Sequence, residues 1–521
     1  MLWLSIVGFG LIAILVVRII GFFCAFRRAP LSLLLALFAA VYIAFSIILL
    51  VPIDLATTTS DYQPLLYLPR QATFALWRIV YWLSFALTWA ILPMTQAFLE
   101  SGHKDRSKRM QEAIRSNARY QLVQLTLAAV GLVYFTLYAG FSITSLKAMA
   151  IALSHSYSLI LSIIFLGIGV VGIPRALYNR SSSDKRLRAL EELAPSLKDH
   201  QTEARMQYSD VSAEVRALTS VMDGPFELWI AELINDAQDV VPAPPLNRMQ
   251  VTEEYLSTLT FRLRKCRLQY ERYEYEWNQL ILQAADLLDI IASRQTHELR
   301  FRMRNSKLSP KLAYFYYVWI KPLLFKIYAL LTAAFSALVV MSEILESTEF
   351  SILGFLSTLL DGFQQELLSF AIVGYMCIAA YSSLAKVRIF NIFNLAPRHT
   401  DTRSAIFYAT QICRMTIPLA YSYISMVPPH VQSSVFEEFL QPSINLTPLG
   451  KYFVQWLPRF ILIPVLVSYF NLYHWLQQKL GFLDSFGEDE EAVGSRAEGR
   501  DLISYELNAR RIRAESRQTT L

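Results

Sequence analysis

The residues whose chemistry stands out are ionisable side chains inside or at the ends of long apolar segments. Arg414 lies about eleven residues into the apolar run 404–426. A charged side chain is costly within a bilayer, so it is expected to face protein, water or an opposite charge. We predict that Arg414 forms an ion pair with a carboxylate; the alternative is that it lines a site for an anion or a head group. The candidate carboxylates are Asp54, Glu343 and Glu366.

Motifs for catalysis or metal binding are missing from the sequence. It contains no H-E-x-x-H, C-x-x-C, G-x-x-x-x-G-K-[ST] or G-x-S-x-G pattern. A G-x-G-x-x-G pattern occurs at Gly167, Gly169 and Gly172, but inside an apolar run rather than after a strand. Glycines in such a run allow close helix packing. We therefore predict a protein that is not an enzyme and has no cofactor or metal site.

The composition predicts the kind of scaffold that positions these residues. Of 521 residues, 54% are hydrophobic and 17% are charged, whereas soluble proteins are about 25% charged. Runs of about 20 apolar residues, enough for a helix to cross a bilayer, fall at about 3–25, 31–52, 76–98, 121–142, 148–172, 320–342, 365–387, 404–426 and 456–478. We predict an all-α polytopic membrane protein with about nine transmembrane helices. Spans one to five occupy 1–174, and spans six to nine occupy 313–480.

The distribution of Lys and Arg predicts the orientation, because these residues accumulate in cytoplasmic loops. The loops after spans one, three and seven are basic, whereas 343–364 and 427–450 contain neither Lys nor Arg. This alternation predicts an outside or lumenal N terminus and a cytoplasmic C terminus, in the plasma membrane or an endomembrane. Asn445 begins a weak glycosylation sequon in an outer loop, followed closely by Pro448. The charged tail, 481–521, is predicted to be disordered.

A hydrophilic insertion, 175–312, separates spans five and six and is predicted to be cytoplasmic. Its apolar positions repeat at alternating intervals of three and four, the pattern of a coiled-coil seam. The seam residues are Leu256, Leu259, Leu263, Cys266, Tyr270, Tyr273, Trp277, Leu280, Ala284, Leu287 and Ile291. A second, shorter seam runs from Ala204 to Met222. We predict an antiparallel helical hairpin in which each seam buries the other.

The longer seam exceeds the shorter one by about two heptads. We predict that residues 200–305 bind a cytoplasmic protein partner through this surplus; the alternative is that the hairpin packs only on itself. The basic stretch 262–267 is followed directly by Glu271, Glu274 and Glu276, a mixture of signs typical of a solvated helix face. We therefore predict no nucleic-acid binding. Lipid is the other expected partner, and the ligand is unknown.

Several strings resemble the limb-region-1-like membrane family, which includes the lipocalin-interacting membrane receptor. These strings are Val51-Pro52-Ile53-Asp54, Leu76-Trp77-Arg78-Ile79-Val80-Tyr81-Trp82, Pro397-Arg398-His399-Thr400-Asp401-Thr402 and Cys413-Arg414-Met415-Thr416-Ile417-Pro418-Leu419. They are most similar to the branch called limb region domain-containing protein 2. The chain departs mildly from the usual pattern, with Ile417-Pro418 where that pattern has Pro-Pro.

The resemblance implies nine spans, an outside N terminus and a large cytoplasmic coiled-coil loop after span five. It implies no enzymatic activity; for this branch it implies a link to G-protein-coupled receptor signalling. Our functional hypothesis is therefore a receptor-like or adaptor membrane protein whose cytoplasmic coiled coil engages signalling or trafficking partners. The alternative is a small-molecule or lipid transporter or escort with a site near Arg414.

Overall fold

The structure, a computed structural model, contains only helices and their connections in the residues it describes. These residues are 2–24, 29–57, 64–139, 143–221, 226–244, 251–304, 308–345, 352–360, 362–386, 395–427, 434–439, 457–472 and 496–519. They divide by contacts into two units. The membrane unit comprises 1–98, 111–174 and 331–486, and the helical unit comprises 99–110, 175–330 and 487–521. The predicted insertion 175–312 thus falls within the helical unit.

Six helical stretches of the described chain are long and apolar enough to cross a membrane. They are α1 (Leu2–Phe23), α2 (Leu31–Thr57), the continuous α3, η1 and α4 (Arg70–Ala86, Leu87–Ile91, Leu92–Glu100), α6 (Ile143–Arg180), the continuous α10, η4 and α11 (Pro310–Tyr314, Phe315–Ile320, Lys321–Ile344), and α13 (Phe363–Lys386). This confirms the prediction of an all-α membrane protein. Each of the six coincides with a predicted span.

The other three predicted spans are largely helical where they are described, apart from a turn at 470–471, and the count of nine stays a prediction. They correspond to α5 (Arg106–Ala139), α14 (Thr402–Met426), and the η5 and α17 pair (Leu457–Ile461, Leu462–Tyr469). α14 carries Arg403, Gln411 and Arg414, which lower its hydropathy. Most of its side chains are nevertheless buried among other helices, so its polar groups need not face lipid. A short helix, α12 (Ile352–Leu359), lies in the predicted outer loop.

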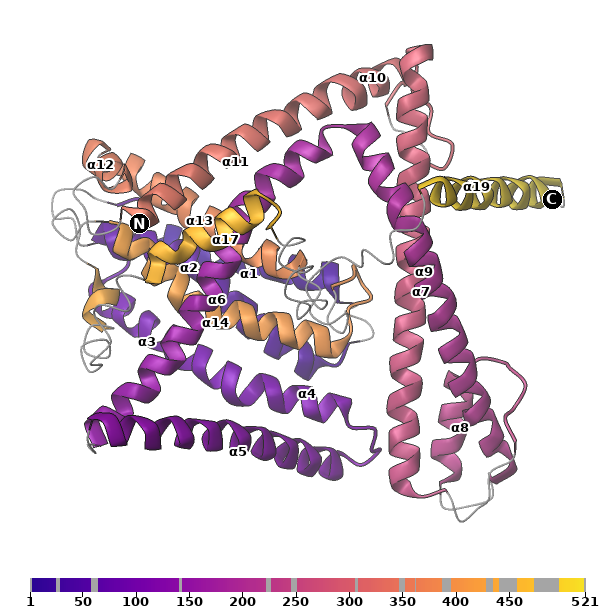
Figure 1. The fold of residues 1–521 in the computed structure, drawn as a ribbon, viewed down its shortest axis with the longest axis horizontal. Helices are drawn as coiled ribbons and strands as arrows, with labels where there is room; N and C mark the ends of the chain where they lie inside the picture. Colours follow the sequence, from indigo (N-terminus) through magenta and orange to yellow (C-terminus); the bar gives the residue numbers. More distant parts are fainter. Residues whose placement is uncertain are drawn as a thin grey trace. The chain divides into compact units, whose positions relative to one another are not determined.

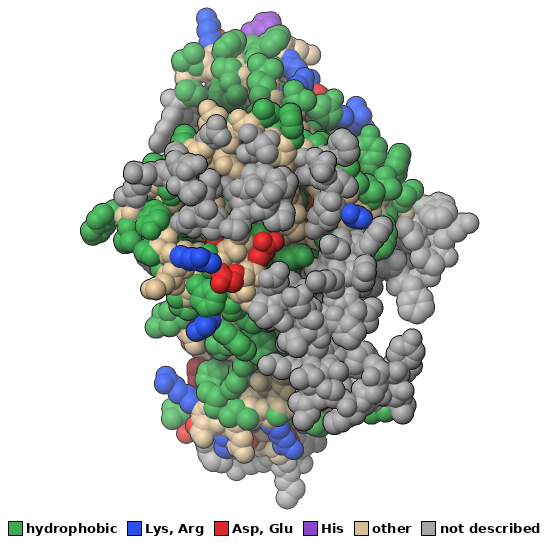
Figure 2. Space-filling view, turned by 90° about the vertical axis from the view of Figure 1, so that its left-hand side faces the viewer, with side chains coloured by type: hydrophobic (Ala, Val, Ile, Leu, Met, Phe, Trp, Pro, Cys, Tyr) green, Lys and Arg blue, Asp and Glu red, His purple; other side chains and the backbone are tan. Residues whose placement is uncertain are grey.

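The core of the membrane unit forms around α2, which contacts α1, α3, α13 and α14. In the most apolar window of α2, 67% of the residues are buried, against 17% for α1. Large exposed apolar side chains gather on α1 and α11 instead, and hydrophobic side chains take up much of the described surface in Figure 2. Such a surface suits contact with lipid, because exposing this much apolar area to water would be unfavourable.

The helical unit is built on α7 (Ser183–Ala217) and α9 (Glu253–Thr296), which lie side by side in Figure 1. Both begin at a capping side chain: Ser182 accepts a hydrogen bond from the Lys185 backbone N–H, and Thr252 accepts one from the Tyr255 N–H. After α7, the short η2 (Leu218–Val221) and α8 (Glu227–Asp236) reverse the chain and pack against the pair.

The C-terminal tail departs from the prediction of disorder. Residues 496–519 form the helix α19, which contacts α7 and α9. Although this segment is highly charged, it has a small apolar face. Ile503 is buried, and Leu502 and Leu507 are partly buried, against α7 and α9. A few apolar residues on one face of a helix suffice once a neighbouring surface is available. The rest of the predicted tail, 481–495 before α19 and 520–521 after it, lies outside the described residues.

Candidate functional site

Asp54 joins three segments of the membrane unit and is completely buried in α2. Its Oδ2 accepts hydrogen bonds from the Trp77 indole Nε1 and the Phe436 backbone N–H, both at 3.0 Å. Its Oδ1 accepts from the Val435 N–H at 2.8 Å. The Trp77 and Phe436 rings pack with their centroids 4.5 Å apart. Asp54 therefore fixes α3 and the short helical segment 435–439 to α2.

The other two candidate carboxylates also receive hydrogen bonds. Glu366, in the first turn of α13, accepts from the backbone N–H groups of Leu65 and Leu66 at 2.9 and 2.8 Å. Glu343, near the end of α11, accepts from the Ser422 hydroxyl of α14. Both side chains are buried. Like Asp54, they connect segments that are distant in the sequence.

Arg414 forms no ion pair with Asp54, Glu343 or Glu366 within the described residues, so the structure does not show the predicted pairing. Its guanidinium instead lies over the Tyr157 ring of α6, 5.5 Å from the centroid. Sequence reasoning had assigned no role to Tyr157, Trp77 or Phe436. The signal available for Trp77 was its indole N–H, which needs an acceptor when the ring is buried.

Arg414→Gln provides a test of this arrangement. Among the described residues the variant strands no carboxylate, so it loses a cation–π contact of about 0.5–2 kcal/mol. We expect its yield of monodisperse protein to stay within about twofold of wild type, with Arg414→Lys as the charge-preserving control. A buried ion pair would behave differently, because breaking one costs about 3–5 kcal/mol. A collapse in yield that Glu343→Gln rescues would contradict the structure.

The predicted seam residues of α9 all face packed surroundings. Leu256, Leu259, Leu263, Trp277, Leu280 and Leu287 are buried, whereas Tyr270, Tyr273 and Ile291 are partly buried. Two clusters cover the seam from Leu256 to Ala284. The first joins the C-terminal half of α7 and the apolar side chains of α8 to the start of α9, and the second joins the N-terminal half of α7 to the middle of α9. This order makes α7 and α9 antiparallel.

The stretch of seam that we expected to be uncovered is packed in the structure. α7 begins at Ser183, well before the predicted second seam, and α19 adds Ile503 to the cluster around Trp277 and Leu280. The sequence analysis assigned no seam to the N-terminal half of α7, which contains Pro195. That proline nevertheless lies inside the helix.

α19 is held on α7 mainly through Glu191, whose side chain is 5% exposed. Arg496 and Arg500 of α19 reach this carboxylate at 2.7 and 3.4 Å. Gly499 lies between them, and a Cβ at this position would overlap the Glu191 backbone carbonyl. Further along, the Arg510 guanidinium donates to the Asn278 side-chain oxygen of α9 at 2.5 Å. A glycine is therefore required at position 499, where α19 approaches α7 closely.

Two of the three glycines of the G-x-G-x-x-G pattern serve helix packing in the membrane unit. A Cβ on Gly169 would overlap the Ala379 carbonyl of α13, and one on Gly167 would come within 2.6 Å of Pro464 in α17. Nothing described lies within 4 Å of the corresponding position on Gly172. Among the described residues, no group of three or more His, Cys, Asp or Glu side chains is placed to hold a metal ion. The sequon at Asn445 lies outside the described residues.

Comparison with known proteins gives a consistent set of relatives. The family described as LMBR1-like membrane protein matches residues 1–473. The G-protein coupled receptor-associated protein LMBRD2 of Gallus gallus is 22% identical over 94% of this chain and 81% of its own length. Its Homo sapiens counterpart is 24% identical over 87% and 71%, and the LMBR1 domain-containing protein 2 homolog of Drosophila melanogaster is 26% identical over 84% and 69%. No solved structure matches.

Proposed function

The chain belongs to the LMBR1-like membrane protein family, and from this we propose that it is a non-enzymatic, receptor-associated protein that takes part in G-protein-coupled receptor signalling. It is an integral, multi-pass membrane protein. The proposal is carried by the relatives with which it aligns over most of its length, whose names describe them as associated with G-protein-coupled receptors. The alternation of basic loops supports the proposed orientation, with the N terminus outside or lumenal and the helical unit in the cytosol.

The proposed partner-binding element is the α7 and α9 pair, specifically the surface that α19 covers. α19 contributes one fully buried apolar side chain, Ile503, among its described residues. Its guanidinium groups remain accessible, with the Arg496 and Arg500 side chains 44% and 64% exposed. Because Ile503 is the one fully buried apolar side chain among the described residues of α19, a competing helix with more apolar area can displace α19. A cytosolic helix of the partner, with basic residues for Glu191 and more apolar area, would replace it.

A seam variant tests whether the helical unit carries the association. Trp277→Asp combined with Leu280→Asp should collapse the α7–α9 packing, because each buried side chain contributes roughly 1.5–3 kcal/mol. We expect the variant to insert into membranes normally but to lose most of its labelling of a co-expressed G-protein-coupled receptor by a proximity-labelling enzyme fused to the C terminus.

The matched control is Leu288→Asp, because Leu288 lies on the same helix and is 39% exposed. This control should label the receptor as wild type does. If the seam variant keeps wild-type labelling, the helical unit is not the binding element. If wild type labels the receptor no more than an unrelated multi-pass protein does, the receptor association itself is wrong.

The second candidate function is a transporter or escort for a small molecule or lipid, with a site near Arg414. It draws on one observation: this arginine has an aromatic ring, and no described carboxylate, beside it. That arrangement suits an anion or head group. Loss of activity in Arg414→Gln at normal yield would favour this function over the receptor-associated one.

A further inference from the structure

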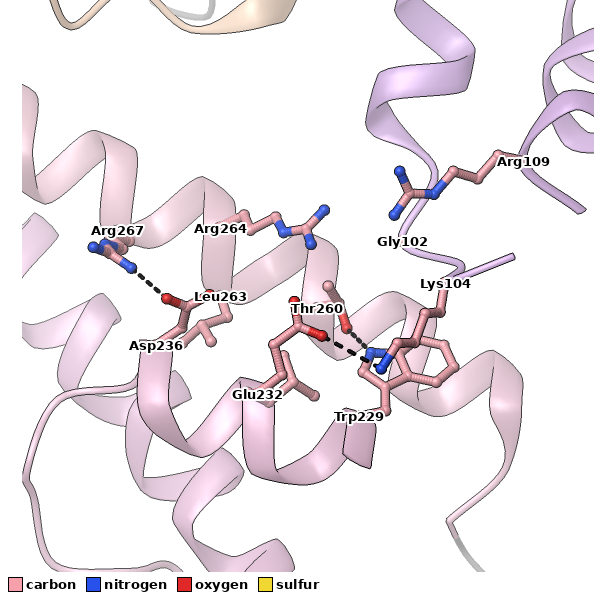
Figure 3. A pocket seen from close by; sticks show the side chains of 11 residues that line it. Gly102, Lys104, Arg109, Trp229, Glu232, Asp236, Thr260, Leu263, Arg264 and Arg267 are labelled. Atoms are coloured by element: carbon pink, nitrogen blue, oxygen red, sulfur yellow. Dashed lines mark hydrogen bonds and ion pairs between the residues drawn. The ribbon is translucent and has the colours of Figure 1, made fainter. Parts of the chain in front are cut away.

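The helical unit contains a basic pocket that the proposed receptor association does not use. Its volume is about 120 Å³, several times the roughly 10–15 Å³ that one water needs in the same measure. Its walls come from the connection between α4 and α5, from the first turn of α5, from α8 and from α9 (Figure 3). Gly102 brings that connection close to α9, since a Cβ there would overlap the Ser257 carbonyl.

Two of the four cationic side chains in the pocket are paired with carboxylates. Lys104 lies 3.6 Å from Glu232, and Arg267 lies 2.8 Å from Asp236. Burial alone would lower the pKa of Arg267, but hydrogen bonds and charges from Glu271 and Asp236 outweigh it, and the pKa is raised. The carboxylates of the pocket are thus already neutralised.

Arg109 and Arg264 supply positive charge that no carboxylate of the pocket pairs with. The Arg109 guanidinium donates to the His103 carbonyl, and Arg264 has no ion pair or hydrogen bond among the described residues. Figure 3 shows the two guanidinium groups extending toward each other from α5 and α9. The pKa of Arg109 is lowered, first by burial and then by the charges of Arg264 and Arg106, which together outweigh the opposing charge of Glu232. An anion between the two groups would relieve this repulsion.

The chain connects the pocket directly to the end of a candidate span. Gly102 follows Glu100, the last residue of a candidate span, by two positions, which limits their separation to about 7 Å. The adjoining segment carries Arg106 and Lys108 as well. Basic segments next to a span are attracted to anionic lipids of the cytoplasmic leaflet, and paired guanidinium groups suit the oxygens of a phosphate.

We propose that this pocket binds the phosphorylated head group of a membrane lipid, held between Arg109 and Arg264 with Lys104 at the rim. The site depends on the cytosolic orientation proposed above but not on receptor association. A phosphomonoester exposes three oxygens, so each guanidinium can donate two hydrogen bonds to it. Phosphatidylserine carries only a phosphodiester, with two non-bridging oxygens, and therefore lacks the phosphomonoester that both arginines can share.

The test uses the purified full-length chain and a fluorescent short-chain phosphatidylinositol bisphosphate. Arg109→Gln combined with Arg264→Gln should weaken binding at least tenfold. The matched control is Arg262→Gln, because Arg262 lies on α9 outside the pocket and pairs with Glu214 at 3.1 Å; it should bind within twofold of wild type. Arg109→Lys with Arg264→Lys keeps the charge and the fold but loses the paired geometry, so binding should weaken at least threefold.

Competition identifies the source of the phosphate. The soluble inositol trisphosphate head group should displace the probe, whereas phosphatidylserine and inorganic phosphate at the same concentration should not. Equal binding by wild type and both double variants would overturn the site. If phosphatidylserine displaces the probe as well as inositol trisphosphate does, the site does not require a phosphomonoester. If inorganic phosphate displaces it equally well, the site binds free phosphate rather than a lipid head group.

Discussion

Asp54→Ala is expected to reduce the yield of folded, monodisperse protein to less than about a tenth of wild type. The substitution leaves the Trp77 indole N–H and the backbone N–H groups of Val435 and Phe436 without their acceptor. Each buried, unsatisfied donor costs about 1–3 kcal/mol, and all three depend on one carboxylate. The total is comparable with the whole stability of many domains. Fluorescence-detected size exclusion of detergent extracts measures the yield directly.

Two matched variants separate this effect from a general intolerance of α2. Ser46→Ala removes another buried polar group of α2, but Ser46 donates only to the Ile43 carbonyl of its own helix, so the yield should stay near wild type. Asp54→Asn keeps one acceptor oxygen and should lie between the two. If the yield of Asp54→Ala equals that of Ser46→Ala, the Asp54 carboxylate does not hold the three segments together.

Gly169→Leu is expected to have an effect of similar size, for a steric reason. Even a Cβ at this position would overlap the backbone carbonyl of Ala379, and backbone cannot move aside as a flexible side chain can. α6 and α13 would have to separate along their contact, with loss of the Ser383 hydroxyl hydrogen bond to the Phe165 carbonyl. We expect little folded protein and a melting temperature lowered by roughly 10 °C or more for what remains.

Gly172 provides the control within the same motif. No described atom lies within 4 Å of a Cβ built there, so Gly172→Leu should be tolerated despite adding the same side chain three residues away. Equal losses from the two variants would show that α6 is sensitive to leucine as such. Equal tolerance would show that α6 and α13 do not approach as closely as the structure has them.

The sequence predicts the membrane scaffold well because length and apolarity are properties of each segment alone. Six predicted spans, including 31–52 and 365–387, coincide with apolar helices. The glycine pattern was also interpretable, because without a preceding strand Gly167 and Gly169 could serve only close packing. Periodicity along α9 likewise indicated which face would be buried, with Leu256 and Leu280 among the packed residues.

Partners across the fold could not be predicted in the same way. Charge alone suggested that Arg414 would pair with a carboxylate, but Asp54 and Glu366 accept backbone N–H groups from loops whose positions no local pattern reveals. α19 was missed for a related reason. The apolar face of α19 is stabilising only when it packs against α7. The overlap between a Cβ at position 499 and the Glu191 carbonyl can be recognised only once both helices are in place.

The central claim is that α19 covers the surface at which the helical unit binds its partner, and Gly499→Leu tests it most directly. The leucine would overlap the Glu191 carbonyl and detach α19, whereas Tyr505→Leu changes a residue of α19 that is 74% exposed and should leave it seated. The measurement is the amount of a co-expressed G-protein-coupled receptor captured with the full-length chain. We expect at least threefold more captured receptor with Gly499→Leu and no change with Tyr505→Leu. Unchanged or reduced capture with Gly499→Leu, at equal protein level, would contradict it.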